Sequence, residues 1–257
     1  MEIVVISIVA FLASILTFFS GFGLGTLLTP VFVLFFPIEV AIALTGVVHF
    51  FNNAFKLFLV GKHANKEVLI RFGIPAVIAA FIGSYLLLNI SDVRPLFTYQ
   101  MFDKTFVVYP IKFIISILLI VFTSLDFIPY VQKLEFSKEK LPIGGFFSGF
   151  FGGLSGNQGA LRTAFLIKAG LSKEAFIGTA VVVSIFVDFT RLSVYFTRLS
   201  AIDLFGNKIL LLSATLSAIA GAYIGNKLLK KVTLKFLHIF VAIMIIIIAI
   251  GLGSGVI

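Results

Sequence analysis

"GGLSGNQGALRTAF", residues 152–165, places the amides Asn157 and Gln158 and the guanidinium of Arg162 inside an apolar part of the chain. Glycines on both sides let the backbone turn and let other groups approach it closely. We therefore interpret the stretch as a break between two half-helices. The position of this break relative to a membrane decides the predicted fold.

The composition is that of an integral membrane protein. Of 257 residues, 60% are hydrophobic and 12% charged, and the mean hydropathy is +1.17. Soluble domains have about 45–50% apolar and about 25% charged residues. Because unpaired backbone groups are too costly in lipid, the apolar segments are expected to be helical. The predicted fold class is an all-α, polytopic integral membrane protein, with the lipid bilayer as its surroundings.

Several classes of function have no support in the sequence. The lack of cysteine excludes disulfides, thiolate metal sites and thiol nucleophiles. No zinc motif, P-loop, nucleophile elbow or dinucleotide fingerprint occurs, so no metal and no cofactor are predicted. The net charge of +9 comes from basic residues between apolar runs. This pattern indicates membrane topology rather than a nucleic-acid partner.

Ten apolar segments are predicted as helices. They lie at about residues 3–20, 24–36, 40–60, 68–90, 107–127, 142–154, 158–170, 172–196, 208–228 and 234–252. The first has no basic region before it and no cleavage site after it, so we interpret it as part of the mature structure.

The lysines and arginines predict the orientation of the chain. One set of linkers carries eleven lysines: Lys62, Lys66, Lys133, Lys138, Lys140, Lys168, Lys173, Lys227, Lys230, Lys231 and Lys235. The opposite linkers carry five basic residues: Arg94, Lys104, Lys112, Arg198 and Lys208. The positive-inside rule puts the first set in the cytoplasm and both termini outside the cytoplasmic membrane.

This orientation predicts two hairpins that point in opposite directions. Residues 142–170 begin and end on the cytoplasmic side, but two full spans need roughly 40 residues, so a re-entrant hairpin that turns at "SGNQG" is expected. Residues 3–36 form the opposite hairpin, which turns near "SGFGLGT" and has room for one complete span plus a shorter arm.

A weak internal repeat supports this arrangement. A shift of 134 positions sets Gly25 on Gly159 and Thr45 on Thr179, and "FIGSYLL" (81–87) is similar to "YIGNKLL" (223–229). We predict one transporter domain, 1–257, built from two inverted repeats of about 1–90 and 142–228. In each repeat a broken hairpin precedes two spans; the span 107–127 links the repeats and 234–252 is a final span. Many secondary transporters are built in this way, with their sites at the repeat interface.

The candidate binding residues lie at the two breaks. Half-helices that begin after the breaks direct free amide hydrogens and a positive dipole end into the space between the repeats, which favours an anion. The expected substrate-binding residues are Gly23, Gly25, Thr26, Asn52, Asn53, Asn157, Gln158, Gly159, Arg162 and Arg191. Two alternatives stay open: the glycines serve close helix packing, and the two amides only cap broken helix ends.

Three further polar groups lie within the predicted spans. Asp188 and Arg191 are three residues apart on one helix face, either as a structural ion pair or with Asp188 carrying a proton or cation and Arg191 released to the substrate. His49 is the only histidine inside a span, either as a hydrogen-bonded helix contact or as a proton relay. Lys56 lies near the amides Asn52 and Asn53.

The glycine-rich break followed by "TLLTPVFVLFFPIEVAIALTG" (26–46) and the stretch "GGFFSGFFGGLSGNQGALRTAFLIKAGLSKEAFIGTA" (144–180) resemble the two copies of one element in the sulfite-exporter TauE/SafE family. The resemblance covers nearly the whole chain. It implies a membrane transporter for sulfite, sulfonates or other sulfur-containing or organic anions. Many relatives carry glycines at Asn157 and Gln158, so the resemblance does not name the anion.

We therefore predict a non-enzymatic secondary transporter for a small anion, with alternating access about the two breaks. A permease or channel for carboxylates or other anions is the closest alternative. A purely structural or receptor-like membrane component is a further alternative. An intramembrane enzyme is more remote, because it needs acid, base or metal-ligand groups clustered at one depth, whereas His49, Asp188 and Asp126 are scattered.

Overall fold

A computed structural model of the chain describes residues 1–20, 23–90, 93–125, 136–166, 169–198, 206–228 and 235–257. Its helices are α1 (Glu2–Ser20), α2 (Leu24–Val33), α3 (Ile38–Val60), α4 (Lys66–Val68), α5 (Ile74–Ile90), α6 (Pro110–Leu125), α8 (Leu141–Ser155), α9 (Gly159–Leu166), α10 (Lys173–Tyr195), α12 (Lys208–Leu228) and α13 (Lys235–Gly253). Shorter turns are η1 (Gly61–His63), η2 (Leu69–Gly73) and η3 (Lys138–Lys140), and the strands are β1 (Phe97–Met101) and β2 (Lys104–Val108).

Within the described ranges, four stretches are long and apolar enough to cross a membrane: Ile38–His63, Lys66–Ile90, Lys173–Tyr195 and Lys208–Lys227. The apolar helices Glu2–Phe18, Leu24–Val33, Pro110–Ser124 and Ala242–Gly253 are shorter. Large apolar side chains such as Phe58 and Phe189 are exposed on the long helices. Polar side chains such as Asn52, Asp188 and Arg191 are buried between the helices within a mostly apolar core, as expected where the outer surface faces lipid.

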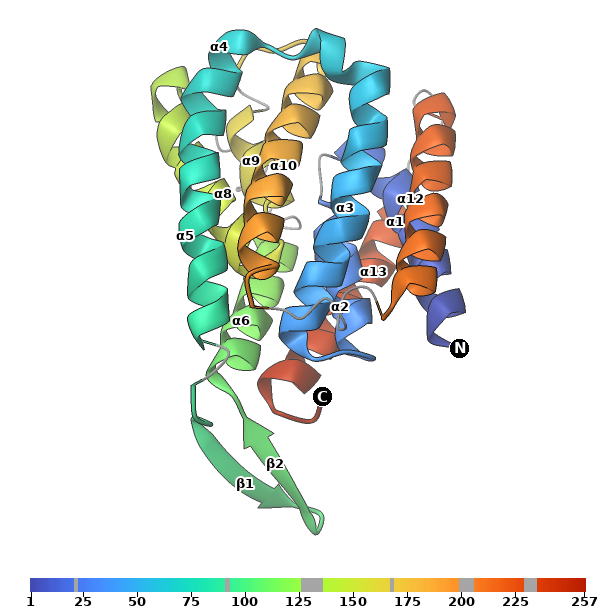
Figure 1. The fold of residues 1–257 in the computed structure, drawn as a ribbon, viewed down its shortest axis with the longest axis vertical. Coiled ribbons are helices and arrows are strands. Elements are labelled where there is room, and N and C mark those ends of the chain that lie inside the picture. The colour runs from blue at the N-terminus through green and yellow to red at the C-terminus, as the bar shows by residue number, and fades with distance from the viewer. Residues whose placement is uncertain (21–22, 91–92, 126–135, 167–168, 199–205, 229–234) are drawn as a thin grey trace.

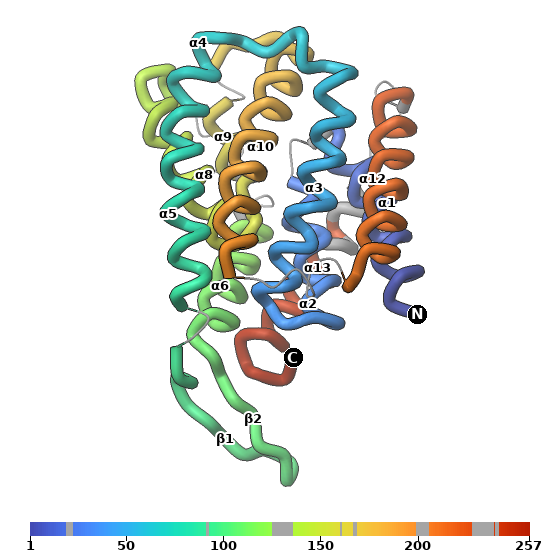
Figure 2. The backbone as a smooth tube through the Cα atoms, viewed as in Figure 1, coloured from blue at the N-terminus to red at the C-terminus, as the bar shows by residue number. Residues whose placement is uncertain are grey.

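The helices form one bundle with two distinct ends (Figure 1). The α4 end carries the connection between α3 and α5, and the hairpin end carries β1, β2 and both termini (Figure 2). Lys62, Lys66, Lys138, Lys140 and Lys173 lie at the start or end of helices at the α4 end. Arg94, Lys104, Lys112, Arg198 and Lys208 belong to the hairpin end. Lys133, Lys168, Lys230 and Lys231 lie outside the described residues.

The two strands are a departure from the predicted all-α fold. They pair antiparallel from Phe97 opposite Val108 to Met101 opposite Lys104. The turn residues Phe102 and Asp103 have positive φ angles of 53° and 59°, the backbone that a two-residue hairpin turn requires. The predicted helix 107–127 was wrong at its start, since Val107 and Val108 belong to β2; Asp126 and residue 127 lie outside the described residues.

Glycines bring pairs of helices into backbone contact. Gly145, Gly149 and Gly153 are four residues apart on one face of α8, and a Cβ atom on each would lie 2.1, 1.9 and 2.2 Å from a carbonyl oxygen of Phe72, Ala76 or Ala80. Small residues allow this close approach between membrane helices. The opposite pair, α12 on α1, uses Gly221, where a Cβ atom would lie 2.3 Å from the Phe11 carbonyl oxygen.

We expect Gly149→Ala to destabilise the protein, because its new methyl group overlaps the Ala76 carbonyl and forces α8 away from α5. The expected loss is about 1–3 kcal/mol, typical of overpacking, measured by thermal unfolding of purified protein in detergent. Gly73→Ala is the matched control, because a Cβ there meets only the Val183 side chain, at 3.6 Å. Equal unfolding temperatures for the two variants would contradict the packing argument.

Candidate functional site

The second break is a defined interruption between two short helices. α8 ends at Ser155, and Gly156 caps it with a left-handed φ of 79°. Glycine adopts this backbone without strain. Residues 156–158 are not helical, and α9 begins at Gly159. The predicted break at "SGNQG" is therefore present, with boundaries close to those expected.

The first break lies directly against the second. Residues 21 and 22 lie outside the described residues, but α2 begins at Leu24 after the extended Gly23. A Cβ atom on Gly23 would lie 3.6 Å from the backbone nitrogen of Gly159. A Cβ atom on Gly25 would lie 2.7 Å from the carbonyl oxygen of Gly156. Gly25 therefore has no room for a side chain, because the backbones of the two breaks are in contact.

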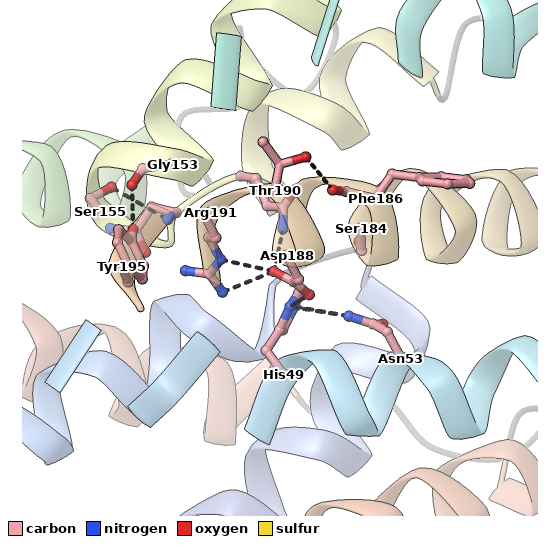
Figure 3. A network of polar contacts seen from close by, with 12 residues as sticks. His49, Asn53, Gly153, Ser155, Ser184, Phe186, Asp188, Thr190, Arg191 and Tyr195 are labelled. Atoms are coloured by element: carbon pink, nitrogen blue, oxygen red, sulfur yellow. Dashed lines mark hydrogen bonds and ion pairs between the residues drawn. The ribbon is translucent and has the colours of Figure 1, made fainter. Parts of the chain in front are cut away.

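A buried carboxylate, Asp188, joins the break to α3 (Figure 3). Its Oδ1 atom accepts from Arg191 Nε at 3.0 Å and from Gln158 Nε2 at 3.4 Å. Its Oδ2 atom lies 2.5 Å from His49 Nδ1. Asn53 approaches the same imidazole, with Nδ2 3.1 Å from Nδ1. The predicted pairing of Asp188 with Arg191 is present, and the same carboxylate is hydrogen-bonded to His49.

A small polar cavity lies on the α4 side of this network. Its volume is about 40 Å³, and helices α1, α2, α3, α9 and α10 all contribute to its lining. Lys56 and Arg162 both line it, and each is only 5% exposed. Arg162 Nη1 donates to the Ser184 hydroxyl, while its Nε atom has no partner among the described residues.

Lys56 has no carboxylate partner in the described part of the chain. Its Nζ atom lies over the Phe18 ring at 5.3 Å from the centroid. Turning the Asn52 amide so that its nitrogen faces the Ala218 carbonyl puts the amide oxygen 3.3 Å from Lys56 Nζ. A cation–π contact and one amide do not neutralise a buried ammonium group. The cavity therefore holds two basic side chains, Lys56 and Arg162, without a carboxylate partner among the described residues.

The other predicted site residues are distributed around these two features. Asn53 and His49 line the cavity, whereas Asn52 faces α1 and α12. Thr26 is buried beside Gly23. Asn157 is buried at the break, and neither amide atom of its side chain has a partner among the described residues. The predicted set is thus brought together at mid-bundle, although only part of it lines the cavity.

Three residues that contribute to the cavity or to the second break were not among the predicted site residues. Lys56 was noted only as a polar neighbour, although a cation inside an apolar span is the same signal that identified Arg162. Ser184 holds Arg162, and the Tyr195 hydroxyl donates to the Gly153 carbonyl next to the break. A serine or tyrosine in an apolar helix gives no comparable signal, because its hydroxyl often bonds within its own helix.

We expect Asp188→Asn and Arg191→Gln each to lower stability by roughly 3–5 kcal/mol, because each leaves a buried charge without its partner. The double variant should recover a large part of this loss. Thermal unfolding of the four proteins measures the coupling. Glu67→Gln is the control, since Glu67 and Arg71 form an exposed pair at 3.4 Å, worth less than about 1 kcal/mol. Additive losses in the double variant would exclude a paired role.

Comparison with known proteins gives the family. A scan against protein-family models matches residues 6–252 to the family described as "Sulfite exporter TauE/SafE". Searches of curated proteins and of solved structures returned no match. The family model extends over both breaks, the cavity and the Asp188 network, and it implies a membrane transporter. With a match over almost its whole length, this multi-pass membrane protein belongs to the TauE/SafE sulfite exporter family.

Proposed function

We propose that the chain is a secondary transporter for a small anion: sulfite, a sulfonate or another sulfur-containing anion. The observation that carries this proposal is the pair Lys56 and Arg162, two buried cations that line one cavity without a carboxylate partner among the described residues. Family membership supplies the transport class. The basic side chains and the small volume of the cavity favour a small anion as the transported substrate.

The charge of the bundle interior favours an anionic cargo. Lys56, Arg162 and Arg191 are buried, whereas Asp188 is the one buried carboxylate among the described residues. The buried lysine and arginine side chains thus outnumber the buried carboxylate by two among the described residues. Buried charges are costly unless they are paired. A bound anion between Lys56 and Arg162 supplies the missing negative charge, and the planar guanidinium of Arg162 suits two oxygen atoms of one ligand.

The size of the cavity favours a compact cargo. A cavity of about 40 Å³ has room for about three water molecules, since one water needs roughly 10–15 Å³ by this measure. Sulfite has four non-hydrogen atoms, so it matches this volume better than a dicarboxylate does. The hydroxyls of Thr17 and Ser184 and the amide of Asn53 add polar groups to the lining.

We further infer that the molecule consists of two inverted repeats, about 1–90 and 142–228. The last helix of each repeat packs against the first helix of the other repeat. α5 packs on α8 through Gly83, where a Cβ atom would lie 2.1 Å from the Phe150 carbonyl oxygen. α12 packs on α1 through Gly225, with a Cβ position 3.4 Å from the Ile15 carbonyl oxygen. Gly83 and Gly225 occupy the same place in "FIGSYLL" and "YIGNKLL". α3 also packs against α10, and α6 against α13.

Alternating access then follows from movement of one repeat against the other about the contacting breaks. The hairpins α1–α2 and α8–α9 would be the re-entrant or shortened elements that permit it. The lysines at the α4 end support a cytoplasmic location for that end by the positive-inside rule. Both termini, at the hairpin end, would then lie outside the cytoplasmic membrane.

Flux measured in vesicles tests the proposal. Purified protein in liposomes should accelerate sulfite uptake in a saturable way, and sulfonates and other sulfur oxyanions should compete more strongly than dicarboxylates. Empty vesicles are the control. Uptake no faster than in empty vesicles would remove the proposed function, and preferential transport of carboxylates would favour a carboxylate permease instead.

We expect Lys56→Met and Arg162→Gln to impair transport without impairing folding. Each removes an uncompensated buried charge, so the unfolding temperature should stay level or rise. Each also removes a charged contact to the anion, worth about 1.5–3 kcal/mol, so the KM for sulfite should rise at least tenfold. Lys62→Met at the exposed α4 end is the control. Parallel losses of transport and stability in the cavity variants would assign both cations to the fold.

A further inference from the structure

A second group of polar residues lies on the other side of the His49–Asp188 pair. Along α3, Thr45 and Gly46 precede His49, while Asn53 and Lys56 follow it. α10 packs beside α3 in the opposite direction, so Ser184 lies toward the α4 end and Arg191 toward the hairpin end. Thr45 and Lys56 are eleven residues apart, about 16 Å along a helix at 1.5 Å per residue. The His49–Asp188 pair therefore separates two polar regions of the bundle interior.

The region on the hairpin side contains buried polar atoms without partners. Arg191 Nη1, both amide atoms of Asn157, and the hydroxyls of Thr29 and Thr45 have no hydrogen-bond partner among the described residues. Arg191, Thr29 and Thr45 are fully buried, and Asn157 is 3% exposed. Such groups normally find partners, because each one left unsatisfied costs about 1–3 kcal/mol.

These atoms converge on the second break. A Cβ atom on Gly156 would lie 3.0 Å from Arg191 Nη1 and 3.6 Å from the Thr29 hydroxyl. Asn157 follows Gly156 directly. A Cβ atom on Gly46 would lie 3.3 Å from the Arg191 guanidinium carbon. Two glycines therefore lie against the same guanidinium group, where a larger side chain would crowd it.

The hydroxyls of Thr29 and Thr45 also lack the hydrogen bond to a backbone carbonyl that serine and threonine often make within a helix. Ser84, Ser155, Ser184, Thr190 and Ser193 each donate to the carbonyl four residues earlier, at 2.8–2.9 Å. Thr29 and Thr45 make no such bond. Their hydroxyls remain available to a group that enters between the breaks.

We propose that Arg191, Thr29 and Asn157 form a second anion subsite, on the hairpin side of the His49–Asp188 pair, which takes the same small oxyanion as the cavity at Lys56 and Arg162. This inference rests on the proposed transport function. In the present conformation Asp188 occupies the Nε and Nη2 side of the guanidinium and the subsite is closed. When the hairpin end opens, the oxyanion binds Nη1 together with the Thr29 hydroxyl and the Asn157 amide.

A sided kinetic measurement tests the subsite. The chain has no cysteine, so one cysteine introduced at the exposed turn residue Asp103 reports, through an impermeant thiol label, what fraction of molecules has the hairpin end outward. Sulfite uptake into vesicles of known orientation, and efflux from them, then give the KM at each face. Four isosteric variants are compared: Thr29→Val, Asn157→Leu, Thr17→Val and Thr123→Val.

Thr29→Val and Asn157→Leu should raise the KM for sulfite at the hairpin face about tenfold, the loss expected for one hydrogen bond to a charged group, and leave the KM at the α4 face within about twofold. The unfolding temperature should not fall, because the removed atoms have no partner. Thr17 lines the other cavity, so Thr17→Val should show the reverse pattern. Thr123 on α6 also has a buried unpartnered hydroxyl, and Thr123→Val should change neither KM.

The outcomes separate the two proposals. If wild-type protein transports sulfite but Thr29→Val and Asn157→Leu behave like Thr123→Val, raise the KM equally at both faces, or lower the unfolding temperature, the second subsite is wrong and the transport function stands. If wild-type protein transports neither sulfite nor a sulfonate or another sulfur oxyanion, the proposed function and the subsite both fail.

Discussion

The contact between the two helix breaks is the constraint on which the rest of the structure depends. Non-helical backbone survives at membrane depth only where protein or water satisfies it. Here Gly23 and Gly25 lie against Gly159 and Gly156, so each break covers the other. α2 and α9 can then begin in the middle of the bundle. α3 and α10, which pack against each other, carry His49, Lys56, Asp188 and Arg191 beside the breaks.

Close helix packing and the charged network are linked through single residues. Gly153 lies against the Ala80 carbonyl of α5, and its own carbonyl accepts from the Tyr195 hydroxyl of α10. Tyr195 lies one turn beyond Arg191, which pairs with Asp188. A displacement of α8 from α5 therefore moves the neighbours of the buried arginine as well. In proteins where such packing has two alternative arrangements, small shifts at a site become rearrangements of whole elements.

Much of the fold could be predicted from the sequence because apolar length is a strong signal. The segment expected at 208–228 is α12, and that expected at 172–196 is α10 (Lys173–Tyr195). The strands were missed because their residues lie in a linker and only partly alternate; they depend on the positive φ angles of Phe102 and Asp103 and on the bond from the Tyr99 hydroxyl to the Ser254 carbonyl.

The candidate site was predictable in kind but not in detail. A charge in an apolar span must face the interior, which identified Arg162, Asp188 and Arg191. Partners 139 positions apart, such as His49 and Asp188, have no signature in one sequence. Asn52 and Asn53 are adjacent, but successive helix residues point about 100° apart, so Asn53 lines the cavity and Asn52 faces α1.

The buried ionisable side chains of the described residues are divided unequally between the two halves of the chain. His49 and Lys56 come from α3, whereas Arg162, Asp188 and Arg191 come from α9 and α10. A dimer of two first halves would gather lysines and histidines with no acid, and a dimer of two second halves would gather four of these arginines around two aspartates. Neither half is therefore interchangeable with the other. The two sides of the His49–Asp188 pair therefore differ: Lys56 and Arg162 lie on the α4 side, whereas Arg191 is the single buried cation on the hairpin side among the described residues.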